Sequence, residues 1–468
     1  MTNPQSAIRN PKSIPQFPKE GLSNDIRRRI AAVEPHCLRT FTPSLAVLAK
    51  SAGCYHWTPE GRKLVDFTSG VLVMNLGHNP IRWWNRVLGY LGLTELATAG
   101  DFCQAVTLNA YNSVTEIETI AAERLVGLMR AQPGGTRCEQ VLWAASGSEA
   151  IQKAVWAALD RRPGEDIILS TRHGFHGKKG LAGAVTGSEQ DPERDPRVKF
   201  LSFPREECVN VARRREPLDL AVYQAQLASL WKEYGRRIAC LITEPYLGGG
   251  GSYHPQKEYI QLLARFCHEH DVVFIFDEVQ ANFGRTGSLF AYTEYGVEPD
   301  IVVVGKALGN GVPVSAAMGR ADLFANMHYG EGSDTWSANP LASAAVLATL
   351  DEYETTEVIE HSRKLSQVIE AGLLRLTELD TVAHVRGEGV VWGVECAEVG
   401  GRSAADVANA CVEACYLGDA SGRAIHLLGP LAQKVIRVAP PLVLPLDEAR
   451  QYLDAMYGIF AEVGRRFR

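Results

Sequence analysis

Residues 274–287 read FIFDEVQANFGRTG, and residues 298–311 read EPDIVVVGKALGNG. The first stretch contains most of the apolar run Val272–Phe276, and the second contains the run Ile301–Val304. Unbroken runs of this length fit strands that are covered on both faces of a sheet. Asp277 directly follows the first run, and Lys306 follows the second after a single glycine. Because Lys is almost never fully buried unless it is paired or functional, its place at a strand end is unusual.

The same pattern of apolar runs extends over the middle of the chain. From about residue 110 these runs alternate with helical stretches, among them Glu149–Leu159 and Lys257–His268. This alternation predicts an α/β fold with a parallel sheet. The further predicted strands are Val141–Trp143, Asp166–Leu169 and Ile238–Ile242.

The two ends of the chain show other patterns. Residues 40–68 predict a hairpin, in which LAVLAK and GCYHW lead through the turn TPEGR to KLVDF. After about residue 345 a long helical stretch leads to a mixed region, from VRGEGVVWGVE to VIRVAPPLVL, which predicts a separate C-terminal lobe. Residues 1–20 are rich in Pro, Asn and Ser and lack the apolar stretch of a signal peptide, so we expect a flexible arm.

Composition excludes several classes of protein. The 468 residues are enough for two or three lobes. The net charge of −6, without a long basic block, gives no support to a nucleic-acid partner. No apolar run reaches the about 20 residues that a membrane-spanning helix needs, so no membrane partner is expected. The ten cysteines are scattered, and we expect reduced thiols in a cytoplasmic protein.

The segment after the strand Val141–Trp143 is suited to bind an anion. It reads Ser146-Gly147-Ser148 and opens a helix. Free N–H groups and the helix dipole favour a phosphate at such a position. The alternative is an ordinary N-cap formed by one of the two serines.

Three other residues after strands could contribute to the same site. Phe175, next to glycine, could lie on a planar ring. Asp277 could bind a metal, cap a turn or pair with a cationic ring nitrogen. Lys306 could form a Schiff base, or it could be a surface lysine. Ligands of open α/β sheets gather beyond the carboxyl ends of the strands, so these groups are expected to converge. Together they match the needs of pyridoxal 5'-phosphate (PLP): a phosphate cradle, a stacking surface, an acid and an amine.

The histidines do not predict a metal site. His173 and His176 lack a third ligand at useful spacing, and His268 and His270 are expected to face solvent. We therefore expect no bound metal.

The sequence resembles the class III aminotransferases, a group of fold-type-I PLP enzymes, from about residue 40 to the C-terminus. The densest stretch runs from Cys240 to Pro340, and 29 positions separate Asp277 from Lys306. The supporting motifs are SGSEA at 146–150, GFHG at 174–177, EP at 244–245, DTWSANP at 334–340, VRGEG at 385–389 and RVAPPL at 437–442.

The resemblance implies an α/β fold, the PLP-dependent transferase fold of type I. A large domain would hold a mostly parallel seven-stranded sheet between helices, and a smaller α+β domain would be built from both termini. The implied division is a flexible arm at 1–20, small-domain segments at 21–75 and 346–468, and a PLP-binding large domain at 76–345.

The implied activity moves an amino group from an amine or amino acid to a 2-oxo acid. It would proceed in two halves, through an aldimine on Lys306 and a pyridoxamine form of the cofactor. Decarboxylation, racemisation, aminomutase or phospholyase chemistry on the same scaffold stays an alternative. A PLP-free binding protein is a third possibility, against which the intact Lys306 and Asp277 argue.

The resemblance also implies roles for individual residues. Lys306 and Asp277 would be catalytic, the first carrying the cofactor and the second holding its ring nitrogen protonated. Arg437 would hold a substrate carboxylate. Thr335 would reach the phosphate in the neighbouring subunit, which implies a homodimer with shared sites and leaves a tetramer open. The other implied cofactor contacts are Ser146, Gly147, Ser148, Phe175, His176, Glu244, Val279 and Gln280.

The sequence departs from the family at several positions. Asn282 stands where the family usually has Gly, and Lys178 where many members have Arg. Gly249 stands where members that handle both an ω-amine and 2-oxoglutarate often have a Glu that pairs with the arginine. Arg437 is therefore expected to stay available in both half-reactions. The glycines at 248–251 are expected to leave open space beside the cofactor, with an apolar wall supplied by Val71 and Leu72.

Overall fold

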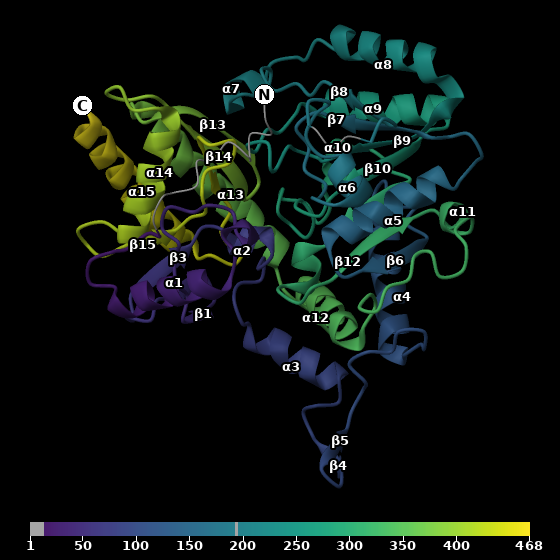
Figure 1. Ribbon diagram of the computed structural model, residues 1–468, viewed down its shortest axis with the longest axis horizontal. Helices are drawn as coiled ribbons and strands as arrows, with labels where there is room; N and C mark the ends of the chain where they lie inside the picture. The colour runs from purple at the N-terminus through teal and green to yellow at the C-terminus, as the bar shows by residue number, and fades with distance from the viewer. Residues whose placement is uncertain (1–13, 192–194) are drawn as a thin grey trace.

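The structure is a computed structural model that describes residues 14–191 and 195–468 (Figure 1). Residues 1–13, most of the predicted arm, therefore lie outside the described residues. Phe17, near the end of that arm, is buried, and its ring centroid lies 5.2 Å from that of Tyr416. Among the described residues, no helix is both long and apolar enough to cross a membrane.

A seven-stranded sheet with the order β6-β12-β11-β10-β9-β7-β8 forms the centre of the large domain. Six strands run in the same direction, and β12 is antiparallel to both of its neighbours. The mostly parallel sheet and all five predicted strands are confirmed, while β8 and β12 come in addition. The strands are β6 (Gln140–Ala144), β7 (Ile167–Thr171), β8 (Val198–Leu201), β9 (Ile238–Thr243), β10 (Val273–Asp277), β11 (Ile301–Val304) and β12 (Ser315–Gly319).

Helices cover both faces of this sheet (Figure 1). Along β10, Val273 and Ile275 face one core, and Phe274 and Phe276 face the other. This explains why the strand is an unbroken apolar run: each side chain is buried on one face or the other. Helix α5 (Gly147–Leu159) packs on the first face, and α9 (Lys257–His270) and α12 (Pro340–Thr355) on the second.

The pairing of β10 with β11 positions Asp277 and Lys306. The two strands are parallel, with Asp277 opposite Val303. Both carboxyl ends therefore lie at the same edge of the sheet, and the chain beyond β11 begins with Gly305 and Lys306. Lys306 starts a short 3-10 turn, Lys306–Gly309.

The small domain joins the two ends of the chain. Strand β3 (Lys63–Asp66) pairs in parallel with β15 (Ala424–His426). A second sheet has the order β13-β14-β16, with β13 at Val382–Glu388, β14 at Val391–Cys396 and β16 at Val435–Val438. The hairpin prediction for residues 40–68 is correct for β2 (Tyr55–Trp57) and β3 but wrong for most of LAVLAK. Only its last residue enters a strand, β1 (Lys50–Ala52), so the segment forms a three-stranded meander.

The remaining elements lie around the central sheet and the sheets of the small domain (Figure 1). A two-stranded hairpin, β4 (Ala97–Ala99) and β5 (Phe102–Gln104), projects from the body of the molecule. The other elements are α1 (Gly21–Val33), α2 (Ser69–Leu72), α3 (Ile81–Tyr90), α4 (Glu116–Arg130), α6 (Gly180–Ala184), α7 (Val211–Arg214), α8 (Ala221–Tyr234), α10 (Ala291–Tyr295), α11 (Ala321–Phe324), α13 (Val358–Leu374), α14 (Ala404–Leu417) and α15 (Leu446–Phe467).

Candidate active site

Glycines let the predicted site loops touch at the carboxyl edge of the sheet. A Cβ added to Gly147 would lie 3.1 Å from Cγ1 of Val279, so the start of α5 contacts the loop after β10. A Cβ on Gly177 would overlap Oγ of Ser148, so the GFHG segment contacts the same helix start. The motifs predicted to converge are therefore in contact.

Lys306 is held in a strained conformation directly behind β11. Its φ of 48° lies in the left-handed region, which a side chain with a Cβ rarely adopts. Burial lowers the pKa of its amine to about 8, although the nearby carboxylate of Asp277 acts to raise it. A larger share of this amine is neutral near pH 7 than for an ordinary lysine, so it is a better nucleophile.

Asp277 is buried at the end of β10 and accepts two hydrogen bonds. Its Oδ2 lies 2.7 Å from Nδ1 of His176, and its Oδ1 accepts from the backbone N–H of Val279 at 3.0 Å. An ionised carboxylate only accepts, so His176 donates from Nδ1. His176 was predicted to touch the cofactor; its contact here is with Asp277. Its backbone N–H donates to Oγ1 of Thr186 at 2.8 Å, which orients this part of the loop.

The residues predicted to bind the cofactor phosphate lie at the start of α5. Ser146 is the N-cap, and its side chain accepts from the backbone N–H of Glu149 at 3.4 Å. Gly147 and Ser148 follow in the first turn, where N–H groups have no partner within the helix. The N-cap alternative is thus correct for Ser146, and it leaves Gly147 and Ser148 free to meet an anion.

Glu244 ties two site loops together. It is buried, and it accepts from the backbone N–H groups of Phe175 at 2.8 Å and Gly248 at 3.2 Å. Burial raises the pKa of this carboxyl to about 7. Glu244 therefore holds Phe175 in place.

Arg437 reaches the site from the small domain. It lies on β16, and its Nη1 donates to Oε1 of Gln280 at 3.2 Å. Burial lowers the pKa of the guanidinium below its ordinary value, while Tyr246 and Glu244 act in the opposite direction. Within the described chain Arg437 forms no ion pair, so its charge is available to an anionic ligand.

Comparison with known proteins decides the family. A sequence profile described as Aminotransferase class-III matches residues 39–460. The chain belongs to the class-III aminotransferases.

Similar proteins cover nearly the whole chain. It is 30% identical over 422 residues to an acetylornithine aminotransferase of Agrobacterium fabrum, covering 88% of this chain and 93% of that protein. It is 29% identical over 454 residues to a probable 4-aminobutyrate aminotransferase of Bacillus subtilis, covering 94% and 95%. The fold is similar to that of the Toxoplasma gondii ornithine aminotransferase, with a TM-score of 0.77, 22% identity and coverage of 96% and 97%.

This aminotransferase uses PLP, and its own residues fit that cofactor. A half-buried amine and a buried carboxylate lie at the ends of two paired strands, beside a helix start with free N–H groups. His176 adds a buried Nε2 that has no hydrogen-bond partner within the described chain. This is the donor set that a phosphorylated pyridine aldehyde needs.

The loop that contains Gly248 and Gly249 is packed more tightly than the sequence suggested. The glycines at 248–251 were expected to leave open space beside the cofactor. Instead, a Cβ on Gly249 would lie 2.9 Å from Cβ of Phe175, and a Cβ on Gly248 would overlap Gln280. The glycines are needed because the loop backbone packs directly against these two side chains, so a Glu at 249 would displace Phe175.

The predicted substrate wall lies on an unusual turn. Ser69, Gly70, Val71 and Leu72 all have positive φ, between 49° and 69°. Leu72 is buried in the core, which is a packing role, whereas Val71 is exposed. The role of an apolar wall beside the cofactor therefore stays a prediction for Val71. Thr335 is also exposed, which leaves it free to meet a second subunit.

Asn282 was noted in the sequence only because the family usually has Gly at this position. In the structure it positions the loop that precedes Lys306. It is buried, and its Nδ2 donates to the carbonyls of Glu278 at 2.6 Å and Gly305 at 3.2 Å. Gly305 directly precedes Lys306, so Asn282 ties the loop of Asp277 to the loop of Lys306. Thr186, which orients the GFHG segment, had no signal in the sequence.

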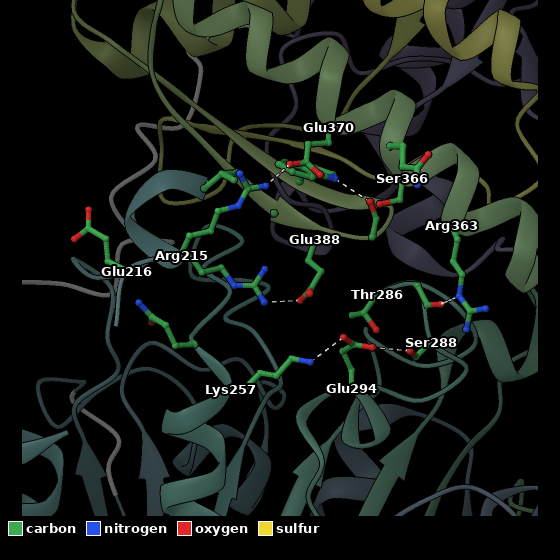
Figure 2. Close-up of a pocket in the computed structure, with 18 of the residues that line it drawn as sticks. Arg215, Glu216, Lys257, Thr286, Ser288, Glu294, Arg363, Ser366, Glu370 and Glu388 are labelled. Atoms are coloured by element: carbon green, nitrogen blue, oxygen red, sulfur yellow. Dashed lines mark hydrogen bonds and ion pairs between the residues drawn. The ribbon is translucent and has the colours of Figure 1, made fainter. Parts of the chain in front are cut away.

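A cavity of about 790 Å³ is lined by charged and polar residues of other segments (Figure 2). It is lined by oppositely charged residues that pair with one another. Lys257 is 3.1 Å from Glu294, Arg214 is 2.7 Å from Glu388, and Arg215 contacts Glu370. These three pairs neutralise one another, and none of the predicted site residues lines the cavity.

Proposed function

We propose that the enzyme transfers its amino group between substrates that carry carboxylates, at least one in each half-reaction, and that Arg437 binds them. The supporting observation is the half-buried guanidinium of Arg437, which lies at the site with an amide as its partner. A bidentate carboxylate would supply the missing counter-charge. Gly249 offers no side-chain carboxylate to compete for it.

We propose roles for the residues at the reacting centre. When bound, PLP draws electrons from the substrate carbon. Lys306 supplies the amine that holds the cofactor and then moves a proton at the substrate carbon. Asp277 keeps the ring nitrogen protonated, and His176 orients Asp277 through its 2.7 Å hydrogen bond. We assign Phe175 and Val279 to the two ring faces, Gln280 to the ring oxygen, and Ser146, Gly147 and Ser148 to the phosphate side, with Glu244 holding Phe175.

A panel of amines and oxo acids tests the proposal. ω-Amino acids belong in it, because similar proteins are named for acetylornithine and 4-aminobutyrate. Each donor is mixed with holoenzyme, and the shift in cofactor absorbance and the yield of new amino acid are measured. We expect carboxylate-bearing acceptors to react and their neutral analogues to fail. Turnover of a donor without any oxo acid would instead indicate another PLP reaction.

Replacing Arg437 by Gln should raise the KM for the oxo acid at least tenfold. A tenfold change corresponds to about 1.4 kcal/mol, as expected for losing a charge-assisted hydrogen bond. Lys at this position should recover only part of the affinity, because it lacks the planar fork. Initial rates over a range of oxo-acid concentrations measure the effect.

Lys434→Gln is the matched control, since Lys434 lies just before the same strand and pairs with Glu395. It should leave the oxo-acid KM unchanged. A stable Arg437→Gln enzyme with the wild-type KM would show that Arg437 only joins the two domains.

We further propose a homodimer with shared sites. Large apolar side chains are more than half exposed between residues 81 and 114, the stretch that runs from α3 through the projecting β4–β5 hairpin to the start of α4, and contiguous exposed apolar surface often marks an interface. A second copy would cover them. They are Ile81, Leu96, Phe102, Leu108, Tyr111 and Val114.

Thr335→Ala should weaken PLP retention, and co-expression with Lys306→Ala should restore part of it. In a mixed dimer, one of the two composite sites would be free of both changes. Random mixing would then leave about a quarter of all sites intact. Activity at limiting PLP, after separation of the differently tagged dimers, measures this. Sedimentation as a monomer, or a mixed dimer no better than its parents, would reject the shared site.

Two predictions remain proposals. A cytoplasmic location is supported by ten free cysteines, eight of them buried, which suits a reducing compartment. The division into 21–75 and 346–468 around a PLP-binding domain at 76–345 is supported by the pairing of β3 with β15.

A further inference from the structure

Three histidines and an aspartate gather in the small domain, and none belongs to the proposed active site. His56 lies on β2, Asp66 ends β3 and His426 ends β15. In the sheet, His426 is opposite Asp66, while His56 is opposite Leu64, two residues before Asp66. Because side chains alternate along a strand, all three project from the same face. His78 joins them from the loop before α3.

The carboxylate of Asp66 is the centre of this cluster. Thr68 donates twice to its Oδ1, from the backbone N–H and the hydroxyl, both at 2.7 Å. Its Oδ2 lies 2.8 Å from Nε2 of His78 and 3.5 Å from Nε2 of His56. Two imidazole nitrogens therefore point at one oxygen of this buried carboxylate.

His426 brings a nitrogen without a partner. The residue is 92% buried, and its Nδ1 has no hydrogen-bond partner within the described chain. A neutral imidazole has one ring nitrogen with a lone pair, and this is the atom that binds a metal ion. Its ring meets that of His56 edge-on, with centroids 5.2 Å apart. A buried ring nitrogen without a partner, beside a carboxylate, is suited to bind a cation.

We propose that His56, Asp66 and His426 bind a divalent transition-metal ion, with zinc as the best match. One ligand atom from each lies within 4.8 Å of the others. A tetrahedral zinc with bonds of about 2.0–2.1 Å places its ligands about 3.3 Å apart, so the pair at 3.5 Å fits already and the His426 ring must close in. Calcium and magnesium prefer several oxygen ligands, which this set does not offer.

The neighbouring polar groups act as the outer support that such a site needs. Ser51 lies opposite His56 on β1, and its Oγ is 2.7 Å from Nδ1 of the His56 ring. This contact orients the ring and leaves Nε2 toward Asp66. His78 orients the carboxylate in the same way. Partners of this kind are common around metal ligands, and their loss typically weakens binding 10–100-fold.

The ion would connect distant parts of the chain. Asp66 and His426 are 360 positions apart and meet only because β3 pairs with β15. A metal here stabilises the junction of the two chain ends, because it binds the folded state and not the separated strands. No metal was expected from the sequence, because these three ligands are far apart along the chain and only histidines close together in sequence give a recognisable metal-binding spacing.

Metal binding to untagged holoenzyme tests this proposal. The protein is stripped with a chelator, reloaded with zinc or cobalt(II), dialysed and analysed by elemental mass spectrometry. We expect one ion per chain, a visible cobalt spectrum of nitrogen and oxygen ligands, and a higher Tm than the stripped protein. His56→Gln and His426→Gln should each weaken binding more than tenfold, and His78→Gln by 10–100-fold. His268→Gln, an exposed histidine on α9, is the matched control and should bind normally.

Two outcomes would overturn the proposal. Wild-type protein that retains no zinc or cobalt after dialysis would show that the cluster binds protons only. Equal metal binding by the His56 and His426 variants would place the ion elsewhere. If a variant fails to fold, anomalous diffraction from zinc-loaded wild-type crystals decides instead: a zinc peak between His56, Asp66 and His426 supports the site, and its absence there rejects it.

Discussion

Lys306→Ala should abolish turnover while the protein stays folded and dimeric. The change removes both the amine that holds the cofactor and the group that moves the proton, so we expect a loss of roughly 10³-fold or more. Alanine has a Cβ, as lysine does, so the left-handed backbone at φ 48° stays equally strained and the loop is not relaxed. Assays with saturating PLP and the visible spectrum of the purified protein measure the effect.

The spectrum separates loss of chemistry from loss of cofactor. The variant should still bind PLP but lose the band of the covalently held form, and an added small primary amine should restore slow turnover. Lys257→Ala is the control, because Lys257 is a surface lysine that pairs with Glu294 in the cavity of Figure 2. If Lys306→Ala keeps wild-type turnover and the same band, another lysine carries the cofactor.

Asp277→Asn should retain PLP in part and lose at least about 100-fold in activity. Without the carboxylate, the ring nitrogen loses the partner that keeps it protonated. Loss of a charged partner can shift a pKa by several units, and each unit is about 1.4 kcal/mol. Asn can still accept the hydrogen bond from Nδ1 of His176, so the loops should keep their arrangement. Rates and cofactor content are measured on the same samples.

A charge change at the other end of the same strand is the control. Asp271 is exposed, precedes β10 and pairs with Arg161 and Arg162. Asp271→Asn keeps a residue that tolerates the left-handed backbone there, so activity should be unchanged. An Asp277→Asn enzyme within about threefold of wild type would reject the assigned role. The activity of His176→Gln should lie between those of Asp277→Asn and Asp271→Asn, because this change disturbs only the orientation of Asp277.

The central strands were predictable because their signal is local. Each predicted run is continuously apolar, and such a run requires burial on both faces. Strands β8 and β12 were not predicted from this signal. Strand β8 has Lys199 within it, and β12 reads SAAMG, whose small side chains make a weak apolar run. The first strand of the N-terminal hairpin was placed too early: only Ala49 and Lys50, the last two residues of LAVLAK, bond to or pair with β2, and Leu48 is exposed.

The packing of the glycine loop was beyond the sequence. Glycines at 248–250 are compatible both with an open pocket and with close backbone contact. Only the positions of Phe175 and Gln280 decide between them, and both come from other loops. The same holds for Leu72, whose apolar side chain fits a substrate wall or a core; it lies in the core.

The sequence alone determined the class of chemistry. A lysine and an aspartate at strand ends, a serine-glycine helix start and their spacing are properties of short segments, which periodicity and residue type reveal. The tertiary structure decided the partner of each group. His176 is 101 positions from Asp277, Gln280 is 157 positions from Arg437, and Asp66 is 360 positions from His426. Such contacts depend on strand order and on how two domains meet, and no local pattern encodes either of these.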